Sequence, residues 1–266
     1  MASTNIICFG QQPNGFFPKG FFVDKILTAR ELQRQIGGKI VWFCHDSDHD
    51  YRETVTKIKT DRYPGGFVRL NINQPSKFEK LFTPLYLKSI KPGWQEEAGN
   101  KLQPIIPQEA HKTFASMQAA TVADFCIAMY RALGRLEGIE VLRSSDPSFR
   151  KKALDISNQD HYIDIEYKGV LVHARKSERG YFLNHGGNVH EYIPANSKPI
   201  TQKLFSPTRE TRFAWMQSVI HCTHYIYGKG EKGYVDFTPW KDVTFVPRKE
   251  IYDSEFAVID PSASSG

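Results

Sequence analysis

One stretch of nine residues concentrates the side chains that could do chemistry. It reads HDSDHDYRE, from His45 to Glu53, and six of the nine residues are His, Asp or Glu. Such a cluster could bind a divalent metal, transfer protons, or hold the ammonium group of a substrate amine. Its carboxylates could also be structural and cap backbone N–H groups. The spacing does not match an EF-hand loop, and the sequence leaves these uses open.

His49 is the natural general base of this stretch, because Asp48 and Asp50 flank it. A neighbouring carboxylate fixes the tautomer of an imidazole and raises its pKa toward neutrality. We therefore predict His49, Asp48 and Asp50 as catalytic residues. His45, at the start of the stretch, is predicted to bind substrate.

A second stretch, GQQPNGFFPKG from Gly10 to Gly20, is rich in hydrogen-bond donors. It matches neither the Walker loop nor the GxGxxG motif. Gln11, Gln12 and free backbone N–H groups could face an anionic or amide ligand near a helix N-terminus. Alternatively, the loop could be a solvated turn whose glutamines only hold the backbone.

The elements around these two loops predict where the loops lie. Asn5–Phe9 and Lys39–Cys44 are short apolar runs typical of buried strands, and the apolar residues between Phe22 and Ile36 follow a helical period. A β-α-β unit of this length closes right-handed into a parallel sheet. Both loops then leave the carboxyl ends of parallel strands, which is where open α/β sheets bind ligands.

The remaining pattern predicts an α/β fold. We expect one Rossmann-like, mainly parallel sheet with helices on both faces, and a helix that begins at Thr121 and ends at Gly138. Alternation between 160 and 193, with turns at Lys168-Gly169 and Arg179-Gly180, predicts a small antiparallel insert at one edge. Residues 1–260 are predicted to form a single domain, and 261–266 a disordered tail. The other predicted parallel strands lie near 139–143, 223–227 and 243–247.

Composition narrows the class of protein. Hydrophobic residues at 40% and charged residues at 24% are typical of a soluble globule. No apolar run approaches the ~20 residues of a membrane span, and the N-terminus lacks the blocks of a signal peptide. The four cysteines have no CxxC spacing and are predicted to be free, buried thiols. We expect a cytoplasmic protein with no membrane partner.

The net charge of +6 is spread along the chain. It suits an anionic ligand and does not form a nucleic-acid-binding arm. We expect small-molecule partners and no nucleic acid, and formation of a homo-oligomer stays open.

Several short motifs occur along the chain in a fixed order. Gly10-Gln11-Gln12-Pro13 is followed twelve residues later by Lys25, and Trp42 precedes Asp48-His49-Asp50. VLRSSDPSFRKKA, from Val141, combines a strand with a Ser-Asp-Pro loop. The C-terminal motifs are Ser206-Pro207, Arg212, Tyr225, Gly228, Gly230-Glu231, Tyr234 and Pro247-Arg248. In kind and order these motifs resemble those of one family, the cysteine-adding enzymes of bacillithiol biosynthesis (the BshC family).

The resemblance implies a Rossmann-like, nucleotidylyltransferase-related domain whose relatives join cysteine to glucosaminyl-malate. Family members also carry a long helical hairpin, and because this sequence has no heptad pattern we expect a shortened form. Residues implied to bind ATP or ADP are Gln11, Gln12, Lys19, Lys25 and Arg248. Residues implied to bind substrate, together with His45, are Trp42, Asp146, Arg212, Tyr225 and Glu231.

The predicted function is therefore a ligase that joins an amino acid to an amine. Amide formation from a free carboxylate is uphill in water, so nucleotide activation is expected, and no metal is expected beyond Mg²⁺ carried with the nucleotide. One alternative is a non-catalytic nucleotide or small-molecule binding protein that kept the pocket. A weaker alternative is a metal-dependent hydrolase.

Overall fold

The central element is a five-stranded parallel sheet with the strand order β12-β11-β1-β2-β5. The computed structural model describes residues 5–154, 156, 159–178, 180–185, 188–194 and 204–259, so the predicted tail at 261–266 lies outside the described residues. The strands are β1 (Ile6–Gln11), β2 (Lys39–Cys44), β5 (Ile139–Arg143), β11 (His224–Tyr227) and β12 (Thr244–Pro247). All five predicted strands are confirmed, and so is the α/β fold class.

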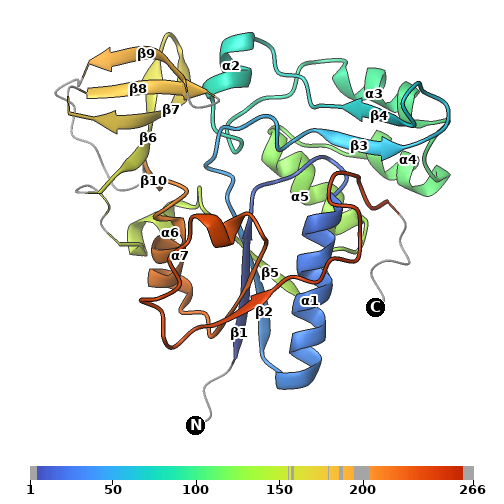
Figure 1. Cartoon of the computed structure of the whole chain (residues 1–266). Helices are drawn as coiled ribbons and strands as arrows, with labels where there is room; N and C mark the ends of the chain where they lie inside the picture. Colours follow the sequence, from blue (N-terminus) through green and yellow to red (C-terminus); the bar gives the residue numbers. More distant parts are fainter. Residues whose placement is uncertain are drawn as a thin grey trace.

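Helices cover both faces of this sheet (Figure 1). On one face, α1 (Gly20–Ile36) and α5 (Val122–Ala132) share a buried cluster with Phe9 and Trp42. On the other face, α6 (Pro147–Lys152) and α7 (Arg212–Ile220) share a cluster with Val41 and Phe43. Residues alternate between the two faces along β1 and β2, which is why both strands are apolar throughout.

Helix α5 begins as the sequence predicts but is shorter. The Thr121 hydroxyl accepts a hydrogen bond from the Asp124 N–H at 3.2 Å, the contact expected of an N-cap. The predicted end at Gly138 is wrong. The helix stops at Ala132, and Gly134 adopts φ = 70°, a left-handed conformation that glycine tolerates at helix ends.

A further layer lies over the α5 side of the molecule. It contains a two-stranded antiparallel sheet, β3 (Thr56–Lys59) with β4 (Phe67–Leu70). Two short helices, α3 (Trp94–Leu102) and α4 (Gln108–Ser116), complete it. A third, α2 (Lys77–Phe82), packs against the antiparallel insert, and a 3₁₀ turn, η2 (Glu231–Gly233), follows β11. No helix in the described ranges is both long and apolar enough to cross a bilayer.

The antiparallel insert is a separate five-stranded sheet with the order β10-β6-β7-β8-β9. In Figure 1 it lies above α6 and α7, beyond the carboxyl ends of the parallel strands. The predicted turn at Lys168-Gly169 is confirmed, because these residues have φ values of 52° and 78°. Of the second predicted turn, Arg179 lies outside the described residues and Gly180 begins a strand. The strands are β6 (His161–Tyr167), β7 (Val170–Ser177), β8 (Gly180–His185), β9 (Asn188–Pro194) and β10 (Phe205–Pro207).

Gly10, in β1, is required by close packing and not by an unusual backbone conformation. A Cβ atom on Gly10 would lie 2.6 Å from His45 Nε2 and 2.8 Å from Tyr225 Oη. Both side chains are buried, so neither can move away freely.

We expect Gly10→Ala to lower the free energy of unfolding by about 1–3 kcal/mol, the usual cost of overpacking a dense interior. Urea denaturation followed by circular dichroism measures the change. Gly233→Ala is the matched control, because a Cβ there meets no atom within 4 Å. Equal stability of the two variants would contradict this account of Gly10.

Candidate functional site

A cavity of about 800 Å³ opens at the carboxyl ends of β1, β2 and β11. Loops that follow these strands form one side of it, and the insert contributes another wall. The cavity lies at the edge of the sheet where the sequence predicts that the two loops meet. Ten predicted site residues line the cavity: Gln11, Gln12, Lys25, His45, Asp48, His49, Asp50, Arg212, Glu231 and Arg248.

Four predicted site residues do not line it. Lys19 precedes α1 and lies 4.0 Å from Glu53, with its pKa lowered by burial. Trp42 is fully buried in the core and donates from Nε1 to Gln11 O. Asp146 caps α6 by accepting from the Ser148 N–H at 2.7 Å. Tyr225 lies behind the wall, where its hydroxyl donates to Glu231.

The first loop is mostly a structural element. Its N–H groups at Asn14 and Phe16 donate to Tyr130 Oη and Thr56 Oγ1, each at 3.0 Å. The Gly20 N–H, at the start of α1, donates to Phe256 O. The prediction that this loop offers free N–H groups is wrong for these three, because the fold already satisfies them. Gln11 and Gln12 remain at the cavity.

Lys25 is already paired within the protein. Its Nζ donates to Glu231 Oε2 at 2.5 Å and to Gly10 O at 2.8 Å, and only 2% of the residue is exposed. Glu231 also accepts from the Tyr225 hydroxyl and from the Gly228 N–H. The Lys25 charge is therefore neutralised before any ligand binds.

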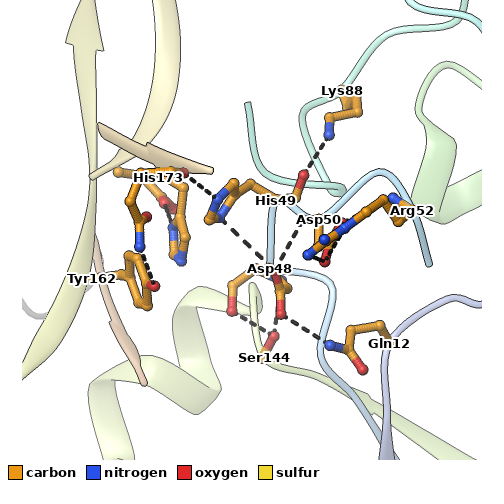
Figure 2. Close-up of polar contacts among 12 residues, drawn as sticks. Gln12, Asp48, His49, Asp50, Arg52, Lys88, Ser144, Tyr162 and His173 are labelled. Carbon is orange, nitrogen blue, oxygen red and sulfur yellow. Dashed lines mark hydrogen bonds and ion pairs between the residues drawn. The ribbon is translucent and has the colours of Figure 1, made fainter. Parts of the chain in front are cut away.

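Asp48 lies where polar groups from three elements meet (Figure 2). It accepts from Gln12 Nε2 at 3.0 Å and from the Asp50 N–H at 3.0 Å, and Arg212 Nη2 lies 3.5 Å away. Burial alone would raise the pKa of this carboxyl. The charges of His49, Arg212 and His173 and the Asp50 N–H outweigh burial and lower the pKa, so Asp48 is ionised at neutral pH.

His49 is held as a neutral imidazole of defined tautomer. Its Nε2 lies 3.1 Å from Asn184 O, and because a carbonyl only accepts, Nε2 carries the proton and Nδ1 is the free base. Nδ1 is buried, makes no hydrogen bond to the described residues and lies 3.9 Å from Asp48 Oδ1.

The predicted rise in the His49 pKa is wrong. Burial, followed by the charge of His173, lowers the pKa to about 4, and Asp48 only partly offsets them. Behind the ring, the buried Lys88 ammonium donates to His49 O at 2.8 Å, and burial lowers the pKa of Lys88 to about 7. Asp50 does not contact the ring, because its carboxylate pairs with Arg52.

One imidazole in the cavity, that of His173, was not predicted from the sequence. His173 Nδ1 lies 2.7 Å from the buried Asp164 carboxylate, and the His173 ring stacks on Tyr162 with centroids 4.4 Å apart. The centroids of the His49 and His173 rings lie 5.4 Å apart, and Figure 2 shows the two rings side by side. The other insert residues that line the cavity are Arg175, Asn184 and Pro207.

The sequence contained a signal for this pair. A two-residue turn at Lys168-Gly169 places Asp164 directly opposite His173 across the hairpin, and the observed register has this pairing. Directly opposed residues on one face of a hairpin are neighbours. What the sequence lacked was any sign that the insert faces the two loops.

Charges of both signs surround the cavity. Acidic side chains come mainly from the loop after β2, at Asp48, Asp50 and Glu53, and basic side chains come from several other elements. The described residues contain no group of three His, Cys, Asp or Glu side chains placed to hold a metal ion. The basic residues at the cavity are Lys25, Arg52, Arg175, Arg209, Arg212, Lys229 and Arg248.

Fold and site together define an α/β protein with a charged cavity at the carboxyl edge of its parallel sheet. No protein-family model matches the chain, and no curated protein matches it. The resemblance to the cysteine-adding enzymes therefore stays a prediction.

The buried, neutral state of His49 predicts a pH dependence of stability. Its folded pKa of about 4 lies below the usual value of 6.5, so the unfolded chain binds a proton more readily between these pH values. Protonation of His49 in the unfolded chain therefore lowers the free energy of unfolding as the pH falls. At 1.36 kcal/mol per pKa unit, the decrease between pH 7 and pH 5 is about 2 kcal/mol.

Between pH 7 and pH 5, we expect the free energy of unfolding of His49→Gln to fall by about 2 kcal/mol less than that of the wild type. Urea denaturation at pH 7 and pH 5 measures both losses. Gln35→Ala, an uncharged substitution at an exposed position of α1, serves as the control. Identical losses in wild type and His49→Gln would show that the folded protein does not hold His49 neutral.

Proposed function

We propose that this protein is a carboxylate–amine ligase that joins an amino acid to an amine after nucleotide activation, like the cysteine-adding enzymes that its motifs resemble. The observation that carries the proposal is a cavity in which an ionised carboxylate, three imidazoles and several arginines meet at the carboxyl edge of a parallel sheet. Amide formation needs one group to hold an ammonium, one to remove its protons and one to hold a carboxylate.

Asp48 supports the amine half of the reaction. It is ionised and half-buried, with 20% of its side chain exposed, so it can bind an ammonium group that enters the cavity. The neighbouring His49 is neutral at pH 7, and its unprotonated Nδ1 lies on the Asp48 side of the ring. An amine bound to Asp48 would therefore lie next to a group that can take a proton from it.

Arg212 supports the carboxylate half. One of its guanidinium nitrogens lies near Asp48, and its Nε, buried at the base of α7, has no hydrogen-bond partner among the described residues. Arginine presents several donors in one plane, which suits a carboxylate. The proposed role of Arg212 is to hold the activated carboxyl group beside the amine.

The proposed binding of a nucleotide rests on the resemblance to the cysteine-adding enzymes. Gln11, Gln12 and Arg248 line the cavity and are proposed to contact ATP or ADP, with Mg²⁺ carried by the nucleotide. Lys25 is proposed to support the cavity wall through its ion pair with Glu231 and not to bind the nucleotide. We further propose a cytoplasmic location, since all four cysteines are buried and free.

A non-catalytic binding protein is the second candidate. Two observations favour it, the burial of His49 Nδ1 and the neutralised charge of Lys25. Such a protein would bind the nucleotide or another small molecule and stop there.

The first test is turnover. We expect the protein, given ATP, Mg²⁺, cysteine and glucosaminyl-malate, to form an amide that mass spectrometry detects, with ADP or AMP released in equal amount. His49→Gln should lower kcat by about 10²–10⁴-fold, the usual contribution of proton transfer. His161→Gln is the matched control, because His161 is also buried but lies outside the cavity.

The second test is binding. ATP or ADP at a hundredfold excess over Kd should stabilise the fold by about 2.7 kcal/mol, a melting-point rise of roughly 5–10 °C. Gln11→Ala should reduce this rise, and Gln35→Ala, at an exposed position of α1, should not. A shift without any amide would favour the binding protein over the ligase. Neither shift nor amide would contradict both the ligase and a nucleotide-binding protein.

A further inference from the structure

The proposed reaction requires two proton acceptors, and this inference rests on that proposed function. A substrate amine arrives as an ammonium and leaves as an amide N–H, so its nitrogen loses two protons. The first must leave before the nitrogen can attack. The second leaves from the cationic nitrogen of the tetrahedral adduct, while the activating phosphate or nucleotide departs with the electron pair of the broken C–O bond.

His49 is suited to only one of these transfers. With a pKa of about 4, it is a weak base that takes few protons from an ordinary ammonium. The nitrogen of the adduct is far more acidic, because it is bonded to the former acyl carbon. General acid–base catalysis works best when the pKa values of donor and acceptor are similar. His49 therefore suits the second proton, which comes from the acidic nitrogen of the adduct.

We propose that His173 is the second catalytic imidazole of the cavity, which takes the first proton on Nε2, with Asp164 as its positioning residue. Asp164 accepts the Nδ1 proton at 2.7 Å, which leaves Nε2 as the unprotonated nitrogen. A proton bound at Nε2 then creates an imidazolium whose charge lies against a buried carboxylate. The Ser-His-Asp triad stabilises its imidazolium in the same way.

Asp164 is held so firmly that it can serve only as an acceptor. Its second oxygen, Oδ2, accepts from Tyr86 Oη at 2.7 Å and from both terminal nitrogens of Arg150, at 3.1 and 3.2 Å. Burial raises the pKa of Asp164, but these donors and His173 lower it further, and the net pKa is below the usual value. The carboxylate therefore stays ionised while fully buried.

The position of the substrate nitrogen follows from Asp48. Asp48 Oδ1 lies 3.9 Å from His49 Nδ1, and Asp48, His49 and His173 all line the same cavity. The rings lie 5.4 Å apart. An ammonium bound to Asp48 can therefore pass its first proton to His173 and, after the C–N bond has formed, its second to His49.

Two variants test this division. His173→Gln removes the base and should lower kcat by about 10²–10⁴-fold with KM within a few fold. Asp164→Asn should give a similar loss by a different route. Tyr86 and Arg150 need an acceptor at Oδ2, so the amide nitrogen must occupy the Oδ1 position, where it donates to His173 Nδ1 and leaves the proton on Nε2.

The tautomer is measured directly by ¹⁵N NMR of the imidazole nitrogens, with the His173 signal assigned by its loss in His173→Gln. We expect an Nδ1–H ring in the wild type and an Nε2–H ring in Asp164→Asn. His161→Gln is the control for both turnover and spectra. If Asp164→Asn does not fold, the role of His173 is tested by the wild-type tautomer and by the turnover of His173→Gln.

An Nε2–H ring in the wild type would overturn the proposal, and so would turnover of His173→Gln within threefold of wild type. Failure of the proposed function has another signature. A wild type that forms no amide would remove the reaction itself, and the role of His173 with it. An active wild type with an equally active His173→Gln variant would remove the role of His173 alone.

Discussion

The buried Asp164 carboxylate determines how the two sheets meet. An ionised group without solvent is very costly unless donors surround it, and Asp164 has four, from His173, Tyr86 and the two terminal nitrogens of Arg150. Arg150, on α6, also donates to Ser144 O after β5 and to Ser206 Oγ on β10. One charged network therefore joins the insert to the carboxyl edge of the parallel sheet. Misplacing the insert would leave a buried charge unpaired, so this network sets the geometry of the cavity wall.

Burial of His49 and Lys88 shifts their pKa values and lowers the stability of the fold. His49 is neutral at pH 7 because the insert excludes water from it, and Lys88 is buried behind it against backbone carbonyls instead of a carboxylate. The insert covers His49 through Asn184 O and the rings of Tyr162 and His173, whereas Lys88 donates to the carbonyls of His49 and Lys80. Sites that hold titratable groups away from their usual pKa values are common where protons are transferred. The loops after β1 and β2 thus supply side chains, and the insert supplies the dry environment in which they act.

The sequence predicted the parallel sheet well because each strand is a short apolar run and the crossover rule fixes the handedness. It predicted most of the site for a related reason, since loops after neighbouring parallel strands must meet at one edge. It failed where the partner is distant in sequence. Lys25 and Glu231 are 206 residues apart, and no periodicity relates them. His173 was missed because local alternation defines a hairpin but not the surface against which the hairpin packs.

The residues that carry the family resemblance also contact one another. Lys25 binds Gly10 O and Glu231, and Glu231 in turn binds the Tyr225 hydroxyl and the Gly228 N–H. Close packing at Gly10 and the bond from Trp42 to Gln11 O belong to the same region. A connected network of this kind constrains its members together, whatever substrate the cavity binds. These motif residues therefore form the floor of the cavity. Strands β6, β7 and β8 of the insert add Tyr162, His173, Arg175 and Asn184 to the cavity lining, and none of these four belongs to the motifs. Substrate choice is accordingly expected to depend on the insert.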